Sequence, residues 1–173
     1  MDIQRKIRIA TTADKAWAVI GPEFADVDKW ASNVFVSTSR NNNAAPSGAP
    51  AGGRVCSTSQ GEFDESIVDY DESRRLIAYA VTGKALPGFV KSIQARWAIQ
   101  PAGPNASTAT MTMTADLAQP FAFLMGWMMK KQFGKAIDES LEEFKFYLEQ
   151  GSVHPRKTER AKSKQAQKAR AAA

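Results

Sequence analysis

The sequence predicts an α+β domain in which an antiparallel sheet has one face covered by a long C-terminal helix. Residues 120–150 show helical periodicity, with a broad apolar stripe opposite a charged face. Residues 33–117 divide into six strand-like segments separated by turn residues. A first strand and two short helical segments precede them. This order fits one domain within 173 residues.

The N-terminal third is expected to hold a strand over 3–9 and helices over 13–20 and 23–31. Thr12 is expected to cap the first helix, because its hydroxyl can accept from a free N–H of the first turn. Gly21 and Pro22 separate the two helices. Alternating, β-branched segments then predict six strands, over 33–40, 54–60, 62–70, 75–82, 89–100 and 107–117.

Between the second and third strands lies the segment 41–53. It holds no apolar side chain larger than Ala or Pro. Such a segment buries too little surface to offset its ordering entropy, so we expect a mobile loop.

The long helix is expected to begin at Pro120, which lacks the N–H that a first turn leaves unpaired, and to stop at Gly151. Gly126 and Gly134 each cost about 1 kcal/mol relative to Ala inside a helix. We expect them to provide room for a crossing strand or a bound ligand. The predicted buried stripe comprises Phe121, Leu124, Met125, Met128, Phe133, Ile137, Leu141, Phe144 and Leu148.

Positive charge is concentrated at the C-terminus. Residues 156–173 hold seven basic residues and one acid, so the remaining 155 residues carry a net charge of −1. We therefore divide the chain into a domain, 1–150, and a basic tail, 151–173. The tail has no apolar stripe, which predicts disorder or a frayed extension of the long helix. Either it only aids solubility, or it binds nucleic acid or an anionic membrane weakly and without specificity.

One cysteine, Cys56, excludes an intramolecular disulfide. The first residues lack the apolar run of a signal peptide, and no later apolar window is long enough to span a bilayer. These features favour a cytoplasmic protein.

The strand over 62–70 places an acid among apolar neighbours. Phe63, Glu65 and Ile67 alternate onto one face, so Glu65 is expected to point inward. A buried carboxylate needs a donor or must stay protonated. It either contacts a ligand, pairs with a basic residue such as Arg96 or Lys91, or is solvated on a bulged strand.

Aromatic and methionine side chains from several elements form the second candidate constellation. They either line a small-molecule pocket or fill an ordinary core. The complete candidate pocket comprises Trp17, Phe24, Trp30, Phe63, Glu65, Ile67, Tyr79, Met111, Met113, Met125, Met128 and Phe133.

The sequence offers few catalytic signals. It has no Gly-rich phosphate loop, paired cysteine ligands or nucleophile elbow, and its one histidine, His154, adjoins the tail. We expect no metal and no cofactor. Cys56 is better explained as a small buried group than as a nucleophile. Any acid–base catalysis would depend on Glu65, with Tyr79 or Arg96.

Several weak motifs together resemble the START-like (SRPBCC) superfamily, and within it the polyketide cyclase/dehydrase and lipid-transport proteins. They are TADKAWAVI, the D-x-x-x-W segment at 26–30, G-x-x-x-E-x-I-x-x-Y-D at 61–71, R-x-L-I-x-Y-x-V at 74–81 and the closing LEEFKFYLE. The resemblance spans about residues 3–149. It implies a helix-grip fold, in which a seven-stranded antiparallel sheet wraps a long helix around a cavity. It also implies that an acid at the position of Glu65 can touch the ligand or its water network.

Three functions follow from this reasoning. The first is binding of a small hydrophobic or amphipathic molecule, such as a lipid, polyketide or isoprenoid, with Glu65 at its polar end. The second is a cyclase, aromatase or dehydrase-like enzyme in which Glu65 moves protons. The third is a non-catalytic module that binds a partner and has a packed interior.

Overall fold

The computed structural model describes residues 1–41 and 45–172, and the backbone alone at 121 and 122. Part of the loop expected to be mobile, residues 42–44, lies outside this description. Seven strands form one antiparallel sheet in the order β1-β7-β6-β5-β4-β3-β2. The strands are β1 (Asp2–Ile9), β2 (Val34–Arg40), β3 (Gly53–Thr58), β4 (Gly61–Asp71), β5 (Leu76–Thr82), β6 (Val90–Pro101) and β7 (Ser107–Leu117).

The first two strands lie at opposite edges of this sheet, although they are neighbours in sequence. The helix α1 (Ala13–Ile20) and the 3-10 helix η1 (Phe24–Lys29) make the connection between them. Thr12 caps α1 as predicted, because its side chain accepts a hydrogen bond from the N–H of Lys15.

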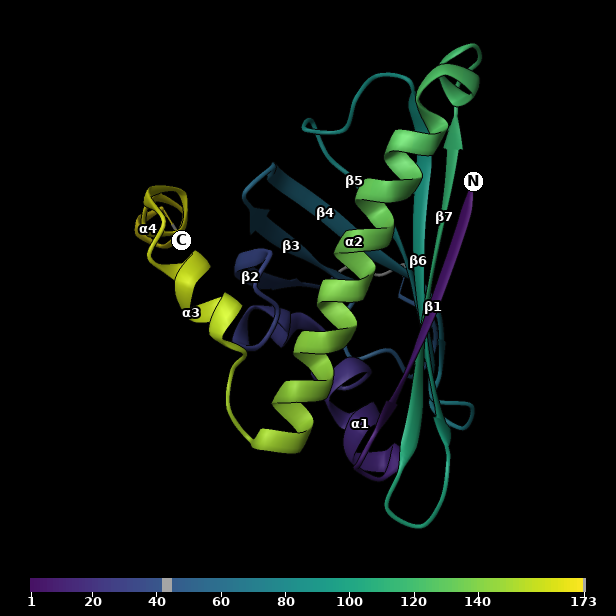
Figure 1. Ribbon diagram of the computed structural model, residues 1–173, viewed down its shortest axis with the longest axis vertical. Coiled ribbons are helices and arrows are strands. Elements are labelled where there is room, and N and C mark those ends of the chain that lie inside the picture. The colour runs from purple at the N-terminus through teal and green to yellow at the C-terminus, as the bar shows by residue number, and fades with distance from the viewer. Residues whose placement is uncertain (42–44, 173) are drawn as a thin grey trace.

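The long helix α2 (Phe121–Gln150) runs along one face of the sheet and contacts β1 and β7, and Figure 1 shows it to the left of both strands. Ile137, Leu141 and Phe144 of this helix are buried between it and the sheet. Trp30 and Trp97 pack against the Phe144 ring, with centroids 5.4 Å and 5.5 Å away. These contacts between helix, η1 and sheet confirm the predicted fold class. No helix among the described residues is long and apolar enough to cross a membrane.

The start of α2 departs from the predicted stripe. Leu124 is 60% exposed, and Met129 takes the buried place that the sequence assigned to Met128. Met129 lies one turn before Phe133 on the same face of the helix, whereas Met128 does not. It packs against Ile93, Ala115 and Leu117.

The two helical glycines differ from each other. A Cβ on Gly134 would lie 3.3 Å from the Arg5 side chain, which agrees with a need for room beside a crossing strand. Gly126 has open space around it, so the expectation that it provides room is wrong.

The C-terminal segment also differs from expectation, because it is helical and docked. The long helix ends at Gly151, which has a left-handed φ of 64°. Two short helices follow, α3 (Pro155–Ala161) and α4 (Lys164–Ala171), and α4 lies against β2 and β3. In Figure 1 they form the yellow layer beside β2. The segment has no apolar stripe, and it docks on the domain through charges and hydrogen bonds instead.

Candidate functional site

A cavity of about 620 Å³ lies between the sheet and α2. Its inner wall is aromatic, because the inward-facing positions of β5 and β6 meet η1 there. Phe24 and Tyr79 stack in a tilted pair with centroids 5.1 Å apart. Trp30 and Trp97 meet edge to face at 6.4 Å. An apolar wall of this kind, with few polar groups, is typical of small-molecule pockets.

An ion pair crosses this wall. Arg54 on β3 and Glu65 on β4 are directly opposite in the strand register. Nε of Arg54 lies 2.6 Å from Oε2 of Glu65, and the two side chains are only 7% and 14% exposed. The Arg54 guanidinium also donates to the Phe24 carbonyl and lies 3.8 Å from the centre of the Phe24 ring. These contacts compensate the burial of its charge.

Gly53 makes this pairing possible. Its φ is +154°, and a Cβ there would lie 2.1 Å from the carbonyl oxygen of Glu65. Only glycine allows β3 to approach β4 this closely, just before Arg54.

Electrostatics favour a charged Arg54 beside a neutral Tyr79. Burial opposes the charge of Arg54, but the neighbouring Glu65 carboxylate prevails and raises its pKa. Burial, followed by the charge of Glu65, raises the pKa of Tyr79 well above its ordinary value, so Tyr79 stays a phenol. Among the described residues, Oε1 of Glu65 accepts no hydrogen bond, and the Glu65 side chain lines the cavity.

The outer part of the cavity is polar and includes the C-terminal segment. Arg160, Ser163 and Gln165 line it together with Glu139 and Glu143 of α2. The docked helices α3 and α4 therefore form part of the cavity wall.

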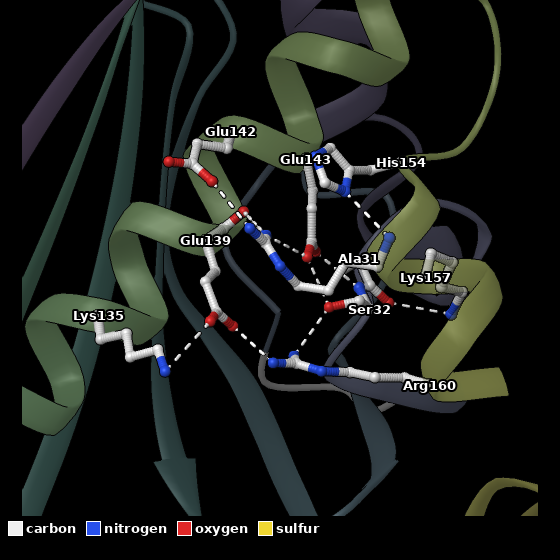
Figure 2. A network of polar contacts seen from close by, with 10 residues as sticks. Ala31, Ser32, Lys135, Glu139, Glu142, Glu143, His154, Lys157 and Arg160 are labelled. Atoms are coloured by element: carbon white, nitrogen blue, oxygen red, sulfur yellow. Dashed lines mark hydrogen bonds and ion pairs between the residues drawn. The ribbon is translucent and has the colours of Figure 1, made fainter. Parts of the chain in front are cut away.

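A network centred on Glu143 holds this segment in place (Figure 2). Glu143 is 1% exposed and accepts hydrogen bonds from the N–H and the hydroxyl of Ser32, at 2.7 Å and 2.5 Å. Arg156 reaches the same carboxylate at 2.8 Å. Arg160 donates to the Ser32 hydroxyl at 2.8 Å and pairs with Glu139 at 2.7 Å. Every charged group in this network has a partner, which makes polar docking stable.

Lys157 completes the docking. Its ammonium donates to the carbonyls of Ala31 and Val34, at 2.9 Å and 2.7 Å (Figure 2 shows the contact with Ala31). Burial lowers the pKa of Lys157 to about 8, against the opposing effect of Asp28. The two carbonyls lie at the end of η1 and the start of β2, so the lysine ties the C-terminal segment to both.

The structure brings together eight of the twelve predicted pocket residues. The cavity is lined by Phe24, Trp30, Phe63, Glu65, Tyr79, Met111, Met113 and Phe133. Their role in binding stays a prediction. Glu65 pairs with Arg54 instead of Arg96 or Lys91, and Arg96 pairs with Asp69.

Four predicted pocket residues lie elsewhere. Trp17 is buried, but its ring packs on Tyr70 at 5.4 Å, outside the cavity wall. Ile67 is buried beside a register shift in β4 and contributes to the core instead. Met125 and Met128 are half-buried and do not reach the cavity, because Met129 and Phe133 occupy the face that turns to the sheet.

The sequence pattern does not identify three of the residues that line the site. Arg54 stands at the start of a predicted strand, and it shares a face with Cys56, two residues on, which is expected to be buried. The pattern along its strand does not determine which face of the sheet Trp97 occupies. Nothing in the sequence pattern indicated that Arg160 would return to the cavity, since its place depends on the turn after Gly151.

Comparisons with solved structures show the same fold at low identity. A START superfamily protein from Mycobacterium smegmatis is 15% identical, with a TM-score of 0.69 over 87% of this chain and 99% of that one. Norcoclaurine synthase from Thalictrum flavum, in a point mutant complexed with a transition-state analogue, is 17% identical, with a TM-score of 0.64 over 88% of this chain and 96% of its own. The di-domain ARO/CYC BexL from the BE-7585A biosynthetic pathway is 10% identical, with a TM-score of 0.66 over 84% of this chain and 45% of its own.

The fold and the cavity between the sheet and α2 define a START-like helix-grip protein. The family model for polyketide cyclase/dehydrase and lipid transport matches residues 1–149, so the chain belongs to that family. No curated protein matches the chain in sequence. The docked helices α3 and α4 lie outside the span of the family model.

Proposed function

We propose that this protein binds a small hydrophobic or amphipathic molecule, of lipid, polyketide or isoprenoid type, in the cavity between the sheet and α2. The observation that carries this proposal is the combination of an aromatic wall with one buried ion pair, Arg54–Glu65. The apolar part of the ligand would lie against Phe24, Trp30 and Trp97. Burying it there is favourable by roughly 25 cal/mol per Å² of apolar surface.

The polar end of the ligand is specified by what the ion pair leaves open. Among the described residues nothing donates a hydrogen bond to Oε1 of Glu65, whereas Oε2 accepts from Arg54. A hydroxyl or phenol that donates a hydrogen bond would satisfy this acceptor. An ether or hydrocarbon of the same size would leave a charged acceptor unpaired, which is costly away from bulk water.

The enzymatic alternative, a cyclase, aromatase or dehydrase-like catalyst, would rest on the same carboxylate. In this site Glu65 is engaged by Arg54, and Tyr79 is held as a phenol by its raised pKa. Tyr79 can therefore donate a hydrogen bond but is poorly suited to act as a base. These features favour binding. The packed partner-binding module is disfavoured by the volume of the cavity.

Two measurements test this proposal. Native mass spectrometry of gently purified protein should show a bound small molecule, and solvent extraction would identify it. In addition, a long-chain alcohol should displace phenylnaphthylamine, a neutral fluorescent probe, with a dissociation constant about tenfold lower than that of the matching methyl ether. Protein that carries no adduct and binds neither the probe nor the alcohol would contradict the proposal.

A further inference from the structure

The start of α2 exposes an unusual set of large apolar side chains. Phe123, Leu124 and Trp127 are 86%, 60% and 71% exposed. Their spacing places them on one side of the first turns of the helix. Elsewhere among the described residues, the exposed large hydrophobic side chains are Val68 (47%) and Val153 (38%), each less exposed than these three and isolated in sequence. Grouped exposed apolar side chains mark interaction sites, whereas single ones do not.

Positive charge borders these three residues. Lys130 and Lys131 follow Trp127 by three and four positions, which places them on the same side one turn further along. Both are exposed, and residues 121–137 contain no Asp or Glu. The same end of the molecule carries the loop between β5 and β6 (Figure 1). That region adds the exposed Lys84 and Lys91, while the exposed Asp116 on β7 is an opposing charge.

We propose that Phe123, Leu124 and Trp127, with Lys130 and Lys131, form a docking surface for an anionic phospholipid bilayer. Exposed tryptophan and phenylalanine side chains insert favourably at the boundary between headgroups and acyl chains. Neighbouring lysines are attracted to anionic headgroups. One helix end thus presents both groups in the arrangement that an interfacial membrane site needs.

The same charges argue against a second copy of the chain as the occupant. A twofold interface would pair this surface with itself. It would bring Lys130 and Lys131 of one copy toward those of the other, and the nearest acid along their helix, Asp138, is already paired with Arg5. Repulsion between like charges opposes such a pairing, whereas an anionic surface is complementary to it.

The surface also lies close to the cavity. Phe133 of α2 and Leu86 of the β5–β6 loop line the cavity wall, and both pack with the cluster that contains Met129. A docked bilayer would therefore contact the end of the protein at which these cavity residues lie. The docking proposal rests on exposed residues alone and does not depend on what the cavity binds.

Vesicle flotation tests the proposal with the full chain. The vesicles contain either phosphatidylcholine alone or phosphatidylcholine with phosphatidylglycerol. We expect flotation with the anionic vesicles, weakened by salt. The emission of Trp127 should shift to shorter wavelength on binding, and this signal is specific because Trp17, Trp30 and Trp97 are only 4–5% exposed.

Paired variants locate the surface. The double variant Phe123→Ser with Trp127→Ser should weaken binding by about tenfold or more, and Lys130→Glu with Lys131→Glu should abolish the preference for anionic vesicles. Control variants are Val68→Ser with Val153→Ser for exposed apolar residues, and Lys164→Gln with Lys168→Gln for the C-terminal charges. Both controls should bind as the original chain does.

Four outcomes would overturn the proposal. They are absence of flotation, equal binding by the Phe123 and Trp127 double variant, loss of binding in the C-terminal control, and a dimer in sedimentation equilibrium that the same double variant abolishes. The last result would assign the surface to a second copy of the chain.

Discussion

Glu65→Gln should destabilise the protein strongly, because it removes the charge that compensates a buried guanidinium. Arg54 is 7% exposed at its side chain, and Glu65 is its only acidic partner among the described residues. Breaking a buried pair by removing one partner costs about 3–5 kcal/mol. We expect about 3 kcal/mol, the lower end, because the contacts of Arg54 with the Phe24 carbonyl and ring persist. Urea unfolding measures this loss, and the slope of the unfolding free energy against urea concentration should stay unchanged.

The adjacent residue provides a matched control. Asp64 on the same strand pairs with Arg40 at 2.6 Å, but these side chains are 33% and 34% exposed. Asp64→Asn should cost about 1 kcal/mol or less, since solvent screens this pair. Equal losses in the two variants would refute the reasoning, because the difference in burial would then have no energetic consequence.

Three further predictions concern other parts of the molecule. Glu143→Ala should release α3 and α4, lower the free energy of unfolding by about 3 kcal/mol and speed amide exchange in both helices. Glu142→Ala should change little, because that side chain is 56% exposed, and equal exchange rates in the two variants would contradict the network. Burial and the charge of Glu65 raise the pKa of Cys56 from 9.0 to about 11, so the contribution of the neutral thiol to stability is complete below pH 9 and is lost as the pH rises toward 11. The free energy of unfolding in urea should fall more steeply across this pH range than it does in Cys56→Ala. Parallel pH dependences of the two proteins would argue against this. Gly126→Ala should stabilise the protein by about 1 kcal/mol, because the added Cβ meets only open space. Gly21→Ala should cost about 2 kcal/mol, because its Cβ would lie 2.4 Å from the Trp17 ring. A thermal unfolding midpoint lower for Gly126→Ala than for Gly21→Ala would refute this packing.

Periodicity was sufficient to predict the elements of the domain because each buries one face. The alternation along 62–70 also gave the inward direction of Glu65, which depends only on the pleat of its own strand. Its partner could not be predicted in the same way. The pairing with Arg54 depends on the register between β3 and β4, which is set by the close approach at Gly53. Register is a property of two strands together, and one strand's pattern does not determine it.

The C-terminal segment shows a different limit. Its residues lack an apolar stripe, and hydrophobic patterning therefore predicted disorder. Docking instead depends on acceptors that become available only when the domain has folded: the carbonyls of Ala31 and Val34 and the buried carboxylate of Glu143. Sequence patterns indicate apolar faces well, but they do not indicate a set of acceptors that two distant segments bring together.

Cavity filling tests most directly the claim that the interior of this protein is a binding site. Ala95 lies in the cavity wall, whereas Ala109 is buried in the core away from it. A fluorescence titration with phenylnaphthylamine should show one saturable site per chain. Ala95→Leu should weaken binding by about tenfold or more, because the added carbons occupy the cavity, while Ala109→Leu should lower stability through overpacking yet leave the affinity of the folded protein unchanged. The account would be contradicted if the probe did not bind saturably, or if it bound the Ala95→Leu protein as tightly as the original chain.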